Sequence, residues 1–171
     1  MEIEAKPTGY NGVVFRSKLE ATWARFFDVI GLAWEYEPTQ IPGWIPDFLI
    51  AGWWLAEVKP MPVIGAGADK DPAFQKAIRD FDTVLLGDGP GDALGMVVRR
   101  MDDGGVFSRY LLADLENGPA ELHPVRKWPV GFHCPMAAIW RGVSESGLSW
   151  QEPPFRSVVL SSYREIMGGA A

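Results

Sequence analysis

The chain has 171 residues, 47% of them hydrophobic and 12% aromatic, enough for one domain with a substantial core. Its single cysteine, Cys134, excludes an intramolecular disulfide and any multi-cysteine zinc or iron–sulfur site. The net charge of −6 disfavours a protein that coats nucleic acid non-specifically, but it is compatible with an enzyme whose metal site is acidic. Because the sequence shows neither a signal peptide nor an apolar run that could span a membrane, we expect a soluble, cytoplasmic protein.

The N-terminal part predicts an arm followed by a helix and a strand. Residues 1–11 lack hydrophobic periodicity, which is typical of an arm. Residues 17–20 (SKLE) form a capping box, and the apolar residues that follow recur at helical spacing up to Gly31, which ends the helix. A short strand over 34–37 is predicted next, because its residues alternate and Pro38 stops the pattern.

Two further strands are predicted over 47–50 and 53–59, and the loop between them decides which residues face each other. A three-residue loop places Asp47 opposite Glu57, so that both carboxylates share one face. A two-residue loop places Asp47 opposite Ala56 and turns the carboxylates apart. A site built from both therefore requires the longer loop, or a bulge with the same effect.

The rest of the chain predicts a second helix and three more strands. Asp71 and Pro72 are typical of a helix start, and we expect Phe74, Ile78 and Phe81 to form its buried face. Strands are predicted over 83–86, 95–101 and 106–112, the last two as a hairpin, and a terminal helix over 155–167. This order predicts an α/β or α+β fold with a mixed central sheet flanked by helices.

The most informative cluster is Asp47, Glu57 and Lys59. Hydrolysis of a phosphodiester at neutral pH requires a divalent metal that activates a water and offsets the charge of the phosphate. Magnesium prefers oxygen ligands, which the two carboxylates and the Val58 carbonyl could supply. Lys59 could position the attacking water or stabilise the developing negative charge. Glu20, in the first turn of the predicted helix, could add a third carboxylate held ionised by the helix N-terminus.

Each of these residues also has a structural explanation that requires no catalytic role. The capping box accounts for Glu20, a turn after Pro46 accounts for Asp47, and a solvated strand face accounts for Glu57 and Lys59. However, the strand face that carries the last two is otherwise apolar, where charges are costly unless they serve a site. The functional interpretation therefore rests on the occurrence of all of them in this order.

The segment from Gly12 to Lys59 resembles the PD-(D/E)xK nuclease superfamily, most of all the small nuclease-like proteins of actinobacterial phages and prophages. Those proteins open with a helix of the pattern G-x-x-F-R-S-x-L-E-A-x-W-A, followed by a P-D-F strand and an E-V-K strand, and all three occur here. The resemblance extends more loosely to the predicted helix over 71–81 and the strand after it. It implies a restriction-endonuclease-like core in which Glu20, Asp47 and Glu57 are metal-site carboxylates and Lys59 is the catalytic lysine. It also implies Mg²⁺ or Mn²⁺ as cofactor and cleavage to a 5′-phosphate and a 3′-hydroxyl.

Nucleic-acid contacts are predicted from the charged and polar residues around this segment. Some relatives carry a glutamine and a tyrosine four residues apart on the second helix. Here Gln75 is followed by Arg79, so that element is incomplete. The candidate contacts to DNA are Arg16, Lys18, Gln75, Lys76 and Arg79.

We therefore expect an arm over 1–11, a nuclease core over 12–112 and a C-terminal extension over 113–171. The expected function is metal-dependent hydrolysis of DNA, with DNA as the partner and the question of a homodimer left open. Two alternatives remain, an end-cleaving endonuclease of a transposition system and a catalytically silent phage module that binds DNA or a protein. The sequence does not separate single-stranded, duplex or branched DNA from RNA as the substrate, and His123, His133 and Cys134 are interpreted as structural or incidental.

Overall fold

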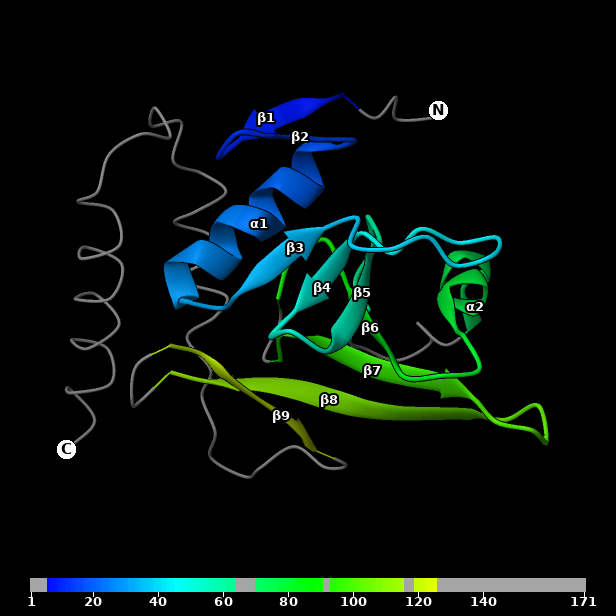
Figure 1. The fold of residues 1–171 in the computed structure, drawn as a ribbon. Helices are drawn as coiled ribbons and strands as arrows, with labels where there is room; N and C mark the ends of the chain where they lie inside the picture. The colour runs from blue at the N-terminus through cyan, green and yellow to red at the C-terminus, as the bar shows by residue number, and fades with distance from the viewer. Residues whose placement is uncertain (1–5, 64–69, 91–92, 116–118, 126–171) are drawn as a thin grey trace, which may run out of the picture.

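A computed structural model of the chain describes residues 6–63, 70–90, 93–115 and 119–125 (Figure 1). The strands in these ranges are β1 (Thr8–Tyr10), β2 (Val13–Phe15), β3 (Trp34–Tyr36), β4 (Phe48–Ile50), β5 (Trp54–Val58), β6 (Thr83–Leu86), β7 (Gly95–Arg100), β8 (Val106–Asp114) and β9 (Glu121–Val125). The helices are α1 (Lys18–Ile30) and α2 (Pro72–Ala77). Strands β3 to β9 form one mixed sheet in sequence order, with β5 and β6 parallel and the other neighbours antiparallel. The predicted mixed sheet with helices is therefore confirmed. No helix of the described ranges has the length and apolar character needed to cross a membrane.

Helix α1 begins and ends where its sequence predicts. The Ser17 side chain accepts a hydrogen bond from the Glu20 backbone N–H, which satisfies one of the free donors of the first turn. Gly31 ends the helix in the left-handed conformation, with φ of 72°, which glycine adopts without steric cost. One face of α1 buries Trp23 and Phe27 completely, and the Trp23 indole N–H donates to the Gly87 carbonyl just after β6. These contacts hold the helix against the sheet, next to β3 in the view of Figure 1.

The sheet separates two apolar clusters, one on each face. The face that packs against α1 contains Phe48, Ala56 and Val84, and the opposite face packs Leu85 and Val98 with residues of α2. Because successive side chains of a strand point to opposite faces, neighbours of these residues can be assigned to a face by register. This assignment decides where the candidate site lies.

The turn between β4 and β5 has three residues, as a shared face for the two carboxylates requires. Ile50 is paired with Trp54, and the register continues to Phe48 opposite Ala56. Asp47 directly precedes β4 and Glu57 directly follows Ala56, so the two residues lie just beyond this last pair. The turn itself uses positive φ at Ala51 and Gly52, 52° and 78° respectively. The loop length on which the sequence prediction depended is therefore confirmed.

Three expectations about element boundaries were wrong. Helix α2 starts at the predicted cap, but it ends at Ala77 because Ile78 is already extended, and Phe81 is 38% exposed rather than buried. Residues 8–10, expected as part of an arm, form β1 and pair with β2. The sheet continues past residue 112, because β8 runs to Asp114 and β9 pairs with it. The expected terminal helix over 155–167 lies outside the described residues.

Gly95 is required by the close approach of β7 to β6. A Cβ atom at this position would lie 2.4 Å from the Leu85 carbonyl oxygen, a distance that backbone atoms cannot relieve without moving a strand. We expect Gly95→Ala to lower the free energy of unfolding by about 2 kcal/mol or more, as measured by urea denaturation. Gly9→Ala is the control, since no atom lies within 4 Å of its Cβ position. Equal stabilities of the two variants would contradict this prediction.

Candidate functional site

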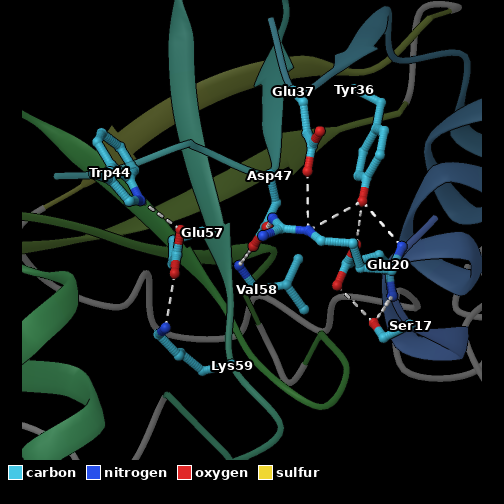
Figure 2. Close-up of polar contacts among 10 residues, drawn as sticks. Ser17, Glu20, Tyr36, Glu37, Trp44, Asp47, Glu57, Val58 and Lys59 are labelled. Atoms are coloured by element: carbon cyan, nitrogen blue, oxygen red, sulfur yellow. Dashed lines mark hydrogen bonds and ion pairs between the residues drawn. The ribbon is translucent and has the colours of Figure 1, made fainter. Parts of the chain in front are cut away.

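Asp47 connects the start of β4 to the end of β5. Its Oδ2 accepts a hydrogen bond from the Val58 N–H at 2.7 Å, and its Oδ1 accepts one from Arg16 Nη2 at 2.5 Å (Figure 2). The residue is only 5% exposed. Both carboxylate oxygens are therefore fixed in orientation, one by the sheet and one by a charged side chain.

The surroundings of Asp47 disfavour its charge. Burial, with the nearby carboxylate of Glu57 as the next cause, raises the pKa of Asp47 from 3.8 to about 7. The Val58 N–H opposes this rise, Glu20 adds to it, and Arg16 opposes it. A buried acid whose pKa is raised by two other carboxylates is the electrostatic signature of a place that would gain from a bound cation.

Glu57 lies on the face of the sheet that packs against α2, because it is paired with Leu85 of that face. Its Oε1 is 2.7 Å from Lys59 Nζ, and its Oε2 accepts a hydrogen bond from the Trp44 indole N–H at 2.7 Å (Figure 2). The side chains of Glu57 and Lys59 are 13% and 21% exposed, so the pair is not a solvated surface pair. The expectation that Glu57 and Lys59 share a face is confirmed.

Trp44 reaches Glu57 from a tight turn that precedes β4. The backbones of Ile41 and Trp44 exchange two hydrogen bonds, of 2.9 and 2.8 Å, around Pro42 and Gly43. Gly43 has a φ of +75°, which a proline–glycine pair at the centre of a turn accommodates. A Pro-Gly pair is typical of such a turn, but nothing in the sequence indicates that the indole binds Glu57.

Glu20 is held by a second network on the α1 side of the sheet. Its Oε2 accepts a hydrogen bond from the Tyr36 hydroxyl at 2.6 Å, and its Oε1 accepts one from Ser17 Oγ at 2.7 Å. Burial and the bond to Glu20 raise the pKa of Tyr36 to about 12, so the phenol stays protonated and donates. Tyr36 also accepts a hydrogen bond from the Arg16 backbone N–H at 3.0 Å. Sequence reasoning missed Tyr36, for which only its place on a strand next to the P-D-F strand was a signal.

Arg16, which was predicted to contact DNA, lies among the carboxylates. Its Nε is 2.9 Å from Glu37 Oε1, and its Nη2 binds Asp47. The side chain is 53% exposed, so one edge of the guanidinium remains open to solvent. Of the other predicted DNA contacts, Lys18 and Lys76 are exposed, whereas Gln75 and Arg79 are half-buried.

The three candidate metal carboxylates do not form a ready-made cluster. Among the described residues, no three His, Cys, Asp or Glu side chains are arranged so that they could hold a metal ion. The sheet explains this, because Glu20 lies on the α1 side, Glu57 on the α2 side, and Asp47 between them at the strand ends. The donor set that remains, Asp47 and Glu57, still suits magnesium, which binds through one or two carboxylates and keeps several waters.

Comparison of the chain with protein-family models, curated proteins and solved structures finds no match. The function is therefore argued from the chemistry of the site. Of the second group of metal-ligating residues in the sequence, His123 is exposed on β9, and its Nε2 is 3.9 Å from Glu121 Oε2. His133 and Cys134 lie outside the described residues.

Proposed function

We propose that this protein is a metal-dependent nuclease that hydrolyses phosphodiester bonds in DNA, with Mg²⁺ or Mn²⁺ as its cofactor. The observation that carries the proposal is the register of the β4–β5 hairpin. It brings Asp47, Glu57 and Lys59, three residues of the sequence pattern, to one end of two adjacent strands. An acid with a raised pKa and a buried acid–lysine pair are costly to stability, which supports a functional reason for keeping them.

The order of the elements gives independent support. The sequence pattern of the PD-(D/E)xK superfamily runs through a helix, a P-D-F strand, an E-V-K strand, a second helix and a further strand. Here α1, β4, β5, α2 and β6 follow in that order, and β4, β5 and β6 are adjacent in the sheet. This agreement supports a restriction-endonuclease-like core.

Each side chain has a role in the proposed reaction. Asp47 and Glu57 would hold the metal, with the Val58 carbonyl as a further oxygen donor, whereas Glu20 lies on the α1 side of the sheet. The bound metal would activate a water and offset the charge of the scissile phosphate. The Lys59 ammonium orients Glu57 and is placed to donate to the attacking water or to a phosphate oxygen as negative charge develops. Arg16 balances the charge of Asp47 until the metal is present.

A second candidate is a catalytically silent binding module on the same fold. One observation favours it. Both oxygens of Glu57, of Asp47 and of Glu20 already accept hydrogen bonds within the protein, so metal binding has to replace some of them. An end-cleaving transposition endonuclease is a variant of the first proposal and differs from it in substrate alone.

The experiment that separates these candidates is a cleavage assay with labelled single-stranded, duplex, branched and transposon-end DNA, together with RNA, in Mg²⁺, Mn²⁺ or EDTA. We expect cutting that requires metal and falls about 100-fold or more in Asp47→Ala. Glu35→Ala is the matched control, since Glu35 is an exposed carboxylate on β3 and its removal should leave the rate unchanged. If no substrate is cut and Mg²⁺ does not change the melting temperature, the nuclease proposal is wrong.

A further inference from the structure

Trp44 carries a second contact besides its bond to Glu57. The Arg79 guanidinium lies over its ring, with Cζ 4.8 Å from the ring centroid. Phe81 also packs against this indole, with a centroid separation of 5.9 Å, and Trp44 is only 8% exposed. A guanidinium at this distance from an indole is attracted by the ring electrons and is held in a defined orientation. Trp44 thus connects Glu57 of the candidate site to a cation.

The charge of Arg79 is not balanced by the protein around it. Its Nε is buried and has no hydrogen-bond partner, and no carboxylate forms an ion pair with the side chain, in the ranges that the structure describes. Asp82, three residues further along the chain, pairs with Arg99 instead, at 3.5 Å. Glu57, beyond the indole, already binds Trp44 and Lys59. A half-buried guanidinium that has no ion-pair partner among the described residues would be stabilised by a bound anion.

Other cations lie in the same part of the molecule. The Arg100 backbone N–H donates to the Arg79 carbonyl at 2.7 Å, and Arg100 Nη2 donates to the Gln75 carbonyl at 3.3 Å. Lys76, on the last turn of α2, is exposed. Together with Arg79, these two cations favour an anionic ligand at this place.

We propose that Arg79, held by Trp44, binds a phosphate of the DNA strand next to the phosphate that is cleaved, and that Trp44 is a positioning residue for both Arg79 and Glu57. This inference rests on the proposed function. The planar guanidinium presents its donors in a fork that matches two phosphate oxygens. Because the indole separates Arg79 from Glu57, the phosphate bound by Arg79 lies beside the carboxylates rather than between them. One rigid ring would therefore fix the strand and a metal-site carboxylate relative to each other.

The first test measures DNA binding without cleavage. A labelled oligonucleotide is titrated with protein in Ca²⁺ and in EDTA at several salt concentrations. We expect Arg79→Gln to weaken binding about 10-fold and to reduce the salt slope by about one. Arg79→Lys should lose less, because it keeps the charge but not the fork. Arg99→Gln is the matched control. It also removes one positive charge, but Arg99 points to the face of β7 opposite to that of its neighbour Arg100, which lies beside Arg79.

The second test separates the two functions of Trp44. Trp44→Phe keeps an aromatic ring under Arg79 but removes the N–H that holds Glu57 Oε2. We expect this variant to bind DNA like the wild type and to cleave it about 10- to 100-fold more slowly. Trp44→Leu removes the ring as well and should also lose DNA affinity to the extent that Arg79→Gln does. A ring that only fills space would give the two variants the same cleavage rate and the same affinity.

The outcomes distinguish this inference from the proposed function. If the wild type cleaves DNA while Arg79→Gln and Arg99→Gln bind it equally well, the inference is overturned and the nuclease proposal stands. If no substrate is cleaved but the salt slope falls only in Arg79→Gln, the nuclease proposal fails and the phosphate contact stands. Thermal melting of every variant shows whether a loss of DNA affinity is caused by unfolding. If Arg79→Gln is unfolded, the DNA affinity of Arg79→Lys is compared with that of Arg99→Gln in its place.

Discussion

Replacing Lys59 by alanine is expected to lower the rate of DNA cleavage by about 10²- to 10³-fold and to leave DNA affinity nearly unchanged. The Nζ atom is 2.7 Å from Glu57 Oε1, and Lys59 directly follows the end of β5. A cation placed there helps most when negative charge develops on the phosphate, which happens in the transition state and not on binding. Single-turnover cleavage rates and oligonucleotide affinities measured in Ca²⁺ would show the two effects separately.

A purely structural role of Lys59 predicts a different pattern. If the lysine only neutralises Glu57, its removal changes the metal concentration needed for cleavage, while the rate at saturating metal stays the same. Lys6→Ala, at an exposed lysine ahead of β1 that is not among the candidate DNA contacts, controls for the loss of one positive charge. A Lys59→Ala enzyme that reaches the wild-type rate at high Mg²⁺ would contradict the catalytic assignment.

The elements that sequence reasoning predicted well are those fixed by local chemistry. Ser17 and Gly31 set the ends of α1 because a cap and a left-handed residue act within one turn of the chain. The hairpin register was one of two that the sequence left open, and the three-residue turn has the one that keeps Phe48 and Ile50 in the core. Once the turn length is given, the sequence predicts that Asp47 and Glu57 lie at the same end of the hairpin, but not how the fold orients the two carboxylates.

The contacts that complete the site were not available in this way. Trp44 binds Glu57 across 13 residues, Tyr36 binds Glu20 across 16, and Arg16 binds Asp47 across 31. Each depends on how separate elements pack, which no local pattern encodes. A tryptophan that fills space and one that orients a carboxylate look the same in a single sequence.

The misplaced boundaries have local causes of another kind. Residues 8–10 are too few to show a period, yet β2 supplies them with a partner. Helix α2 ends early because Ile78 turns into an extended conformation, and this moves Phe81 out of the predicted buried face and onto Trp44. The deviation from the helical pattern thus occurs beside the candidate site, where local rules are expected to yield to function.

In metal-free solution the stability difference between Asp47→Asn and the wild type is expected to depend on pH. The folded-state pKa of Asp47 is about 7, above the ordinary value of 3.8, so the folded protein holds a proton that the unfolded chain releases. The wild type therefore loses stability as the pH rises from about 4 to about 7, and stays at the lower level above that. The asparagine variant has no such proton, so it should be the more stable protein at pH 8, by about 2 to 4 kcal/mol, and should lose this advantage near pH 4.

Urea denaturation in EDTA between pH 4 and pH 8 measures this difference directly, with Asp88→Asn as the control at an exposed aspartate. Adding Mg²⁺ at pH 8 should then stabilise the wild type, by about 2.7 kcal/mol at a hundred times the dissociation constant, and the asparagine variant much less. The metal would stabilise the ionised form of Asp47 that the fold by itself disfavours. If the difference in free energy of unfolding between variant and wild type does not change with pH, the fold does not raise the pKa of Asp47. The electrostatic part of the case for a metal site then fails, even if the hairpin geometry is correct.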